Sequence, residues 1–458
     1  MAIAAVSHEF EVHRREPELL RPAKPTPHEF KYLSDIDDQE GFRFHLQAAF
    51  FYRNNPSRAG KDPVKTIREA LAKTLVFYYP FAGRLREGPN RKLIVECNGK
   101  GIVFIEADAE ATIEDFGDPI KPPFPCMEEL LYHVPGTTGV LNCPMLLVQV
   151  TRLKCGGFIF AFHYNHTLSD GPGIVQFLRA VGEIARGAEA PSVLPVWERH
   201  LLSASDPPRV THQHLEYQES ASKFDNTSES VDLIDRSFYF GPKQLFTLRS
   251  LLPPGSHSAF EIMTACLWKC RTMALQLHPE EEVRFMCVIN ARAKFSPPIL
   301  PQGYYGNGFV LPVVATTAGE LCKNPVAYSL DLVKKAKAKL SKDYVRSVAS
   351  YLVLNGRPHF NAARTFIVSD IKNTGIGDVD FGWGEVLYGG TAEAGSDMLP
   401  GCTYITSFTT SGGEKGTMVS LSLPAPVMER FVKELDLLLK KNQPSGGDAS
   451  SKFVQSSL

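Results

Sequence analysis

The strongest constraint on the fold is a strand pattern that runs through a short polar loop into a helix pattern between residues 157 and 187. Alternation of side chains with a period of two is typical of a strand buried on at least one face, and apolar residues at helical spacing follow a break at Gly171-Pro172-Gly173. The alternating residues are Phe158, Phe160 and Phe162 against Ile159, Ala161 and His163, and the helical set is Ile174, Phe177, Leu178, Val181, Ile184 and Ala185. The pattern predicts a mixed α/β fold.

The loop between these two elements reads His166-Thr167-Leu168-Ser169-Asp170-Gly171. His166 is expected at the exit of the strand, where functional side chains often lie. The unperturbed pKa of histidine is near neutrality, so an imidazole held neutral there can take a proton from an alcohol or an amine. The spacing of four between His166 and Asp170 falls in a loop and does not itself bring the two side chains together.

Composition limits the classes of function. The chain has 458 residues with 43% hydrophobic content, enough for two or three domains. A net charge of −1 provides no basic surface for nucleic acid. No apolar run approaches the roughly 18 residues that span a bilayer, and charged residues interrupt the first 20, so neither a membrane anchor nor secretion is expected. The nine cysteines include no Cys-x-x-Cys pair and predict neither disulfides nor a zinc site.

Further elements follow from periodicity. In the first half we expect a helix over residues 63–75, a hairpin of residues 93–97 and 101–105 around Asn98-Gly99, and a strand at 145–150 paired with 157–165. In the second half we expect strands near 237–240, 284–289 and 308–314, and helices at 259–277, 326–340 and 427–440. The predicted division is a first domain over 1–187 with His166, a crossover linker over 188–226, a second domain over 227–442 with the Asp380-Gly384 loop, and a flexible tail over 443–458.

Three further motifs carry a family resemblance: Asp380-Phe381-Gly382-Trp383-Gly384, Tyr79-Pro80-Phe81-Ala82-Gly83-Arg84 and Asn290-Ala291-Arg292. Together with the His166 loop they make the chain similar to the plant BAHD acyltransferases over nearly its whole length. The resemblance implies two domains of the chloramphenicol acetyltransferase type, each a mixed sheet flanked by helices, with an active-site channel between them. It also implies acyl transfer from an acyl-CoA co-substrate to an alcohol or amine, by a monomer with no permanent cofactor and no metal.

The resemblance assigns roles to three of these residues. His166 would be the general base in a ternary complex without an acyl-enzyme, which agrees with the absence of a Gly-x-Ser-x-Gly motif. Asp170 would be turned away from the pocket and structural, paired with Arg292. Breaking such a pair from one side destabilises a protein by about 3 to 5 kcal/mol when the pair is fully buried.

The Asp380 loop would be mainly structural and would shape the coenzyme side of the channel. Gly382 and Gly384 permit backbone angles that other residues avoid, and Asp380 lies beside them. Trp383 has two readings of equal weight: its indole N–H contacts the oxyanion, or its ring is simply part of the core.

Residues for the two substrates follow by position. Ser256 and Ser258, just before the expected helix at 259–277, suit an anion of coenzyme A at a helix N-terminus, although Ser258 is equally suited as an ordinary N-cap. Leu46, Ala48 and Phe50 lie on one face of a strand-like segment and predict an apolar pocket for a small hydrophobic alcohol.

The N-terminal signature, residues 21–27 with 33–38, resembles the branch of benzyl alcohol benzoyltransferases and fruit alcohol acyltransferases. The expected reaction is therefore benzoyl-CoA with benzyl alcohol. Alternatives are transfer from acetyl-CoA or hydroxycinnamoyl-CoA to other alcohols or amines. From other classes, a metal-binding protein would use His163, His166 and Asp170, and a hydrolase would use Ser169 with His166. The ending Ser456-Ser457-Leu458 resembles a peroxisomal address and favours that compartment over the cytoplasm.

Overall fold

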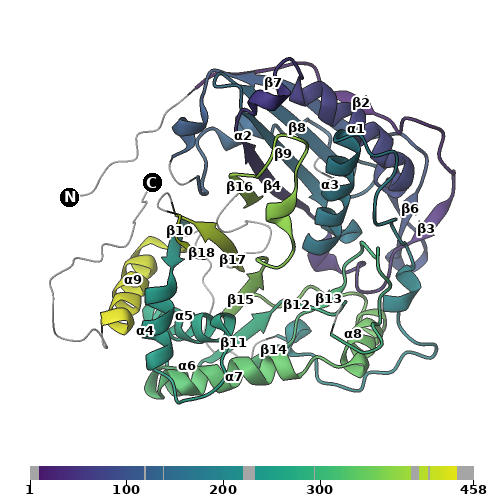
Figure 1. The fold of residues 1–458 in the computed structure, drawn as a ribbon. Helices are drawn as coiled ribbons and strands as arrows, with labels where there is room; N and C mark the ends of the chain where they lie inside the picture. The colour runs from purple at the N-terminus through teal and green to yellow at the C-terminus, as the bar shows by residue number, and fades with distance from the viewer. Residues whose placement is uncertain are drawn as a thin grey trace.

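Two mixed β-sheets, one built mostly from each half of the chain, form the framework of the protein in its computed structural model (Figure 1). The structure describes residues 10–440, with gaps at 118–119, 138, 220–232, 293, 393–401 and 411–412. The predicted tail at 443–458, including its last three residues, lies outside the described residues, as does the end of the predicted linker. The architecture of two mixed sheets flanked by helices is the one that the family resemblance implied.

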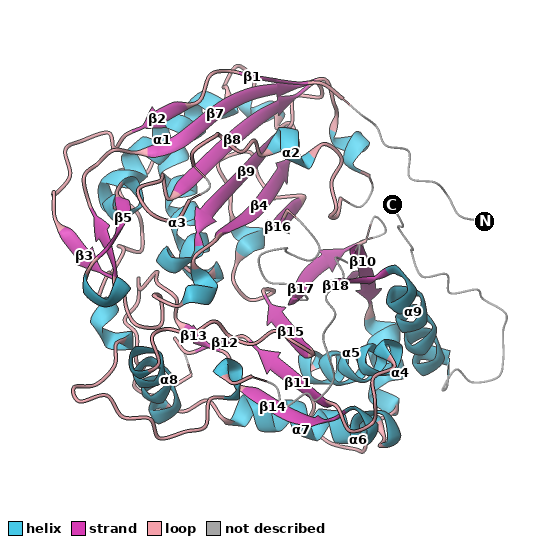
Figure 2. Cartoon of the chain, turned by 180° about the vertical axis from the view of Figure 1, so that it is seen from behind, coloured by secondary structure: helices cyan, strands magenta, loops and turns pink. Residues whose placement is uncertain are grey.

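The first sheet has the strand order β1-β7-β8-β9-β4-β16, with β2 also paired to β7 (Figure 2). Only β7 and β8 run parallel within it, since its other pairs are antiparallel. Its strands are β1 (Val12–Arg14), β2 (Glu18–Leu20), β4 (His45–Tyr52), β7 (Ile102–Ala109), β8 (Leu146–Leu153), β9 (Phe158–Asn165) and β16 (Tyr388–Thr391). The predicted pairing of β8 with β9 is confirmed.

The alternation along β9 divides the first sheet into two faces. Phe158, Phe160 and Phe162 contribute to the core beneath helices α1 (Pro63–Phe77) and α3 (Gly171–Ala185). Ile159 and Ala161 contribute to a second core on the other face, near the short helix α2 (Met127–Leu130). The strand is therefore buried on both sides, and its end at Asn165 delivers the next residue, His166, to the edge of the core.

The second sheet has the order β10-β18-β17-β15-β11-β14, and helices of the second half other than α8 share its core. Its strands are β10 (Leu233–Phe240), β11 (Glu282–Cys287), β14 (Val313–Thr317), β15 (Thr365–Asp370), β17 (Cys402–Thr409) and β18 (Lys415–Pro424). The helices of this half are α4 (Pro242–Ser250), α5 (Ala259–Leu275), α6 (Ala318–Lys323), α7 (Val326–Ala338), α8 (Lys342–Leu354) and α9 (Ala425–Lys440). The sequence predicted α5, α7 and α9, and it missed α4, α6 and α8.

Two small sheets complete the fold, and one of them corrects a prediction. The three-stranded sheet contains β3 (Phe30–Tyr32), β5 (Arg84–Glu87) and β6 (Leu93–Glu96), while β12 (Ile289–Asn290) pairs with β13 (Phe309–Val310). The predicted hairpin around Asn98-Gly99 is wrong, because β6 pairs with β3 and β5 whereas β7 belongs to the large sheet. The turn is present, but it carries the chain from one sheet to another.

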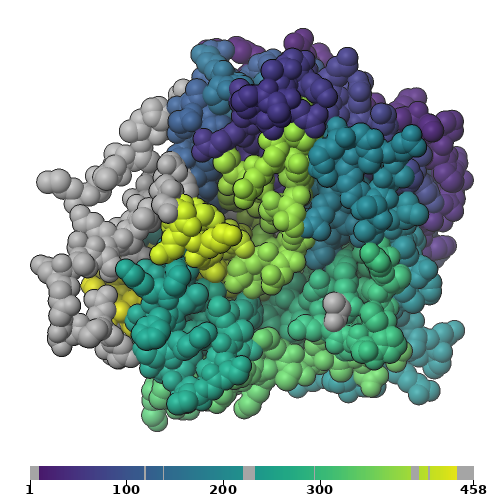
Figure 3. Space-filling model, viewed as in Figure 1, coloured from purple at the N-terminus to yellow at the C-terminus, as the bar shows by residue number. Residues whose placement is uncertain are grey.

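A segment from the second half of the chain crosses to the first sheet. β16 pairs antiparallel with β4, with Gly390 opposite Ala49, and Phe381 and Trp383 lie in the core under α1 and α3. Figure 3 shows the yellow-green surface of this part of the chain against the purple and blue surface of the first half. The assignment of the Asp380-Gly384 loop to the second domain is corrected accordingly. Among the helices of the described residues, none combines the length and apolar character needed to cross a membrane.

Candidate active site

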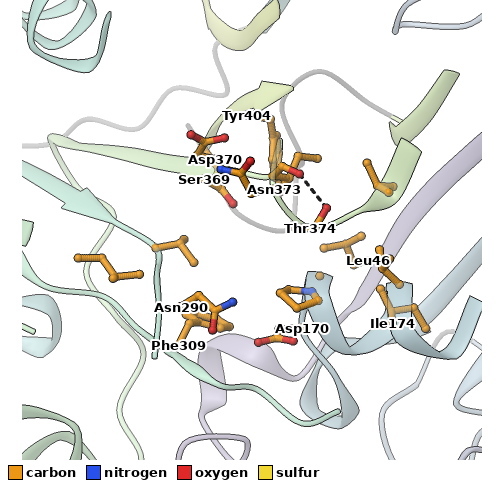
Figure 4. A pocket seen from close by; sticks show the side chains of 18 of the residues that line it. Leu46, Asp170, Ile174, Asn290, Phe309, Ser369, Asp370, Asn373, Thr374 and Tyr404 are labelled. Atoms are coloured by element: carbon orange, nitrogen blue, oxygen red, sulfur yellow. Dashed lines mark hydrogen bonds between the residues drawn. The ribbon is translucent and has the colours of Figure 1, made fainter. Parts of the chain in front are cut away.

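A cavity of about 760 Å³ lies between the two halves of the molecule, with His166 in its wall. Figure 4 shows Leu46, Asp170 and Ile174 on one side and Ser369, Asn373, Thr374 and Tyr404 across from them. The first group comes from β4 and the start of α3, and the second from β15, the segment after it and β17. The cavity therefore has one wall from each sheet, as a channel between two domains requires.

His166 begins a short 3₁₀ turn directly after β9. Its backbone N–H donates to the Phe44 carbonyl at 2.9 Å, and the Asn165 side chain caps the turn by accepting from Thr167 N at 3.1 Å. The imidazole packs against aromatic rings, with centroid distances of 5.0 Å to Phe42 and 5.2 Å to Phe44. These contacts fix the ring at the end of the strand and leave it 7% exposed at the cavity.

Burial controls the protonation state of His166. Desolvation is the largest effect and lowers the pKa of the imidazole below its usual value, while the negative charge of Asp170 opposes it. The balance leaves the ring neutral at physiological pH. A neutral imidazole facing a cavity is what a general base requires.

The expected ion pair between Asp170 and Arg292 is present. Arg292 Nη1 donates to Asp170 Oδ2 at 2.7 Å and Nη2 donates to Oδ1 at 2.8 Å, a bidentate contact. Each carboxylate oxygen also accepts a backbone N–H, from Gly173 at 2.9 Å and from Gly308 at 2.9 Å. Asp170 lines the cavity, so it is not turned fully away from it, yet both its oxygens are engaged and it also caps α3.

The oxyanion reading of Trp383 is corrected by its position. Its ring lies 5.4 Å from that of Phe158, at the opposite end of β9 from His166, and the Arg58 guanidinium lies 5.5 Å from its centroid. An eight-residue strand separates the two ends by about 25 Å. Trp383 is therefore core. Asp380 organises the loop, since its Oδ1 accepts from the N–H groups of Gly382 and Gly384, both at positive φ.

The predicted acceptor residues lie on the cavity and the predicted coenzyme residues do not line it. Leu46, Ala48 and Phe50 all contribute to its wall. Ser258 is the N-cap of α5, with its hydroxyl accepting from Glu261 N at 3.2 Å and its own N–H donating to the Glu261 carboxylate at 2.9 Å. The carboxylate of Glu261 already occupies the helix N-terminus where an anion was expected, while Ser256 is exposed just before it.

The geometry opposes the two alternatives from other classes. His163 packs with His45 and His133, at ring centroid distances of 5.2 Å and 5.0 Å, on the sheet face away from the cavity. It therefore does not converge with His166 and Asp170 on a metal, and the described residues contain no other group of side chains arranged to hold one. The Ser169 hydroxyl donates to the Tyr305 carbonyl at 2.7 Å, so it is not a nucleophile held by His166.

Sequence reasoning missed a second buried carboxylate beside the histidine loop. Asp37 accepts from Arg199 Nη1 at 2.9 Å and from the Asn307 backbone and side chain at 2.8 and 2.9 Å. The Asn307 side chain also donates to the His166 carbonyl at 2.8 Å. The sequence feature that could have indicated this junction is the pair of glycines around Asn307, Gly306 and Gly308. The structure explains one of them, because a Cβ at Gly306 would lie 1.9 Å from Arg199 Nη1.

Comparisons with known proteins identify the family of the chain. The family model described as Transferase family matches residues 10–438. Benzyl alcohol O-benzoyltransferase of Petunia hybrida is 56% identical over 434 residues, covering 94% of each chain. Alcohol acyl transferase 1 allele GSa of Malus domestica is 50% identical over 438 residues, again covering 94% of each.

Solved structures support the fold. Vinorine synthase superposes with a TM-score of 0.72 at 22% identity, over 93% of this chain and 98% of that one. F. sporotrichioides TRI101, crystallised with coenzyme A and T-2, superposes with a TM-score of 0.69 at 16% identity, over 88% and 97%. The chain belongs to the Transferase family, and it is an acyltransferase of the BAHD type that its motifs predicted.

Proposed function

We propose that the protein is an acyl-CoA:alcohol O-acyltransferase that transfers a benzoyl group from benzoyl-CoA to benzyl alcohol and releases benzyl benzoate and coenzyme A. The observation that carries this proposal is the neutral His166 at the wall of a two-sided cavity, in a chain 56% identical to two benzyl alcohol O-benzoyltransferases. Acetyl-CoA or hydroxycinnamoyl-CoA as the donor, and an amine as the acceptor, are the alternatives within the same chemistry.

The chemistry needs one base and no covalent enzyme intermediate. A lone pair of the His166 imidazole takes the hydroxyl proton as the alcohol oxygen attacks the thioester carbonyl. The tetrahedral intermediate then collapses, the C–S bond breaks, and the thiolate of coenzyme A takes the proton back from the imidazolium. The acyl group passes directly from sulfur to oxygen, so both substrates must occupy the cavity together.

The cavity wall suggests where each substrate binds. The side formed by Leu46, Ala48 and Phe50 is apolar and suits the ring of benzyl alcohol, which gains free energy mainly by leaving water. Two lysines, Lys294 and Lys337, belong to the wall contributed by the second half. We assign that side to the coenzyme phosphates.

The direct test is ester formation by purified protein from benzoyl-CoA and benzyl alcohol, with release of free thiol followed in parallel. We expect equal amounts of benzyl benzoate and coenzyme A from the wild type, and a loss of about 10²-fold or more in His166→Ala. A panel of donors and alcohols extends the test. Much faster turnover of acetyl-CoA with every alcohol would reject benzoyl transfer, and full activity of His166→Ala would reject the base.

We also propose a peroxisomal location and a monomeric state. The support for the location is the terminal tripeptide Ser456-Ser457-Leu458. A fluorescent protein fused to the N-terminus of the full chain should mark peroxisomes, and the same fusion without the tripeptide should mark the cytosol. Light scattering of the purified protein should give a mass near 50.7 kDa.

A further inference from the structure

The histidine loop is held from the second half of the molecule by the side chain of Asn307, which lies at a buried junction. Asn307 is fully buried, and its amide nitrogen donates to Asp37 Oδ1 at 2.9 Å and to the His166 carbonyl at 2.8 Å. Both partners are acceptors only, since one is a carboxylate and the other a carbonyl. The atom between them must therefore be the amide nitrogen, and the orientation of the amide is fixed.

This orientation leaves the amide oxygen of Asn307 as a free acceptor beside the histidine. Both Asn307 Oδ1 and His166 Nδ1 are buried polar atoms without a hydrogen-bond partner at standard geometry. The two atoms belong to residues that already share a hydrogen bond through the His166 carbonyl. A hydrogen bond between these two atoms would satisfy both, if Nδ1 carries the proton.

The electrostatics agree with that assignment. After the charge of Asp170, hydrogen bonds to its own carbonyl and to the Asn307 side chain raise the pKa of His166, as acceptors near a ring N–H do. The charge of Asp37 acts in the same direction. These effects oppose the larger desolvation that keeps the ring neutral.

We propose that Asn307, oriented by Asp37, is a positioning residue that holds the neutral His166 imidazole with its proton on Nδ1, so that Nε2 presents the basic lone pair to the cavity. The inference rests on the proposed role of His166 as the base. Asp37 is itself fixed by Arg199 Nη1 at 2.9 Å and by the Ser34 hydroxyl at 2.6 Å, so the amide cannot easily turn over. Asp170 raises the pKa of His166 through its charge, but its oxygens accept from Arg292, Gly173 and Gly308 and so do not fix the orientation of the ring by a hydrogen bond.

The first test determines the tautomer of His166 in the wild-type protein. Nitrogen-15 NMR of histidine-labelled enzyme at pH 8 distinguishes the tautomers, because Nε2 couples to two ring protons and Nδ1 to one. The His166 signals are identified by their absence from His166→Ala. We expect the proton on Nδ1. A proton on Nε2 in the resting enzyme would overturn the proposal.

The second test is the pH profile of kcat/KM in Asn307→Ala. We expect kcat to fall by at least ~10-fold with KM changed less than threefold, because the base spends less time in the productive tautomer. The acidic limb should move to lower pH, since an acceptor that favours the protonated ring has been lost. A merely structural loosening would admit water, relieve desolvation and move the limb to higher pH.

Ser169→Ala is the matched control. It removes the hydrogen bond from Ser169 Oγ to the Tyr305 carbonyl, which joins the same two segments without touching the imidazole. We expect it to lower stability but to leave the tautomer and the acidic limb in place. An Asn307→Ala enzyme with wild-type kcat and tautomer would reject the inference alone, whereas full ester-forming activity of His166→Ala would reject the proposed role of His166 as the base, on which the inference rests.

Discussion

Asp170 is buried with four hydrogen bonds to its carboxylate, two from Arg292 and one each from the N–H groups of Gly173 and Gly308. Replacing it by alanine would leave the Arg292 charge and two backbone donors without a partner. We expect Asp170→Ala to lower the free energy of unfolding by about 3 kcal/mol, measured by urea denaturation. Arg346→Ala, which removes an ion pair with Asp343 that is more than two-thirds exposed, should change it by less than ~1 kcal/mol. Equal losses of stability in the two variants would mean that the buried pair of Asp170 and Arg292 contributes no more than an exposed pair.

Two buried histidines away from the cavity make stability depend on pH. Burial, with the neighbouring His133 adding to it, lowers the pKa of His45 to about 4 and holds that of His163 well below its usual value. Their pKa values are lower in the folded than in the unfolded state, so the unfolded state binds more protons and stability falls as pH drops below the unfolded value of about 6.5.

We therefore expect the wild type to lose about 2 kcal/mol of stability between pH 7 and pH 5 through His45 alone. His45→Gln, which has no proton to gain, should show a smaller loss over the same interval, whatever its stability at pH 7. Thermal unfolding at both pH values measures the difference. An identical pH dependence in the two proteins would mean that His45 is not the group responsible.

At the residue scale, the sequence predicted the positions of those site residues that belong to a local sequence motif. His166, Asp170 and Arg292 belong to motifs, and the structure brings all three to one junction. Trp383 was open between two readings because a rare aromatic beside two glycines gives no position relative to His166. Asn307 was missed because its partners, Asp37 and the His166 carbonyl, lie 270 and 141 residues away in the chain.

At the scale of elements, prediction succeeded where burial of one face leaves a period in the sequence. β9, α1 and α3 were recovered for this reason, since packing against a core selects apolar side chains at fixed intervals. The hairpin failed because Asn98-Gly99 specifies a turn but not the partner of each strand. A Gly101 backbone at φ +96° directs the chain past Leu20 and into the large sheet instead.

The docking of the Asp380 loop on α3 depends on a glycine in the helix. A Cβ at Gly182 would lie 2.4 Å from the Asp380 carbonyl oxygen, so the loop would have to move. We expect Gly182→Ala to lower the melting temperature although alanine favours a helix over glycine by about 1 kcal/mol. Gly377→Ala, in open space near the same loop, is the control and should be neutral. A melting temperature of Gly182→Ala above that of the wild type would show that the loop can move away from the added Cβ without loss of stability.

At the scale of the whole molecule, segments of the second half pack into the first half. Domain boundaries drawn along the sequence cannot describe this arrangement. β16 completes the first sheet, and the backbone of residues 305–308 bonds to Ser169, Asp37 and Asp170 of the first half. Periodicity reports burial but not which of two cores buries a segment. A division by residue number therefore gave the second domain a loop whose Phe381 and Trp383 lie in the core of the first sheet.

The exchange of segments predicts that the two halves unfold together. Arg199, from the segment joining them, is 2% exposed and pairs with Asp37, while its other guanidinium nitrogen donates to the Leu168 carbonyl at 2.8 Å. Arg199→Leu would remove the only cationic partner of Asp37 among the described contacts. We expect this change to lower the free energy of unfolding by about 3 kcal/mol.

Calorimetry should therefore show one endotherm in the wild type and one in Arg199→Leu, moved down as a unit by roughly 3 to 6 °C. Arg68→Leu removes a half-exposed ion pair with Glu18 within the first half, so it controls for the loss of a charge and should move the endotherm by less than about 1 °C. Two endotherms, only one of which responds to Arg199→Leu, would mean that each sheet and its helices fold independently and that the junction serves the site without joining the halves.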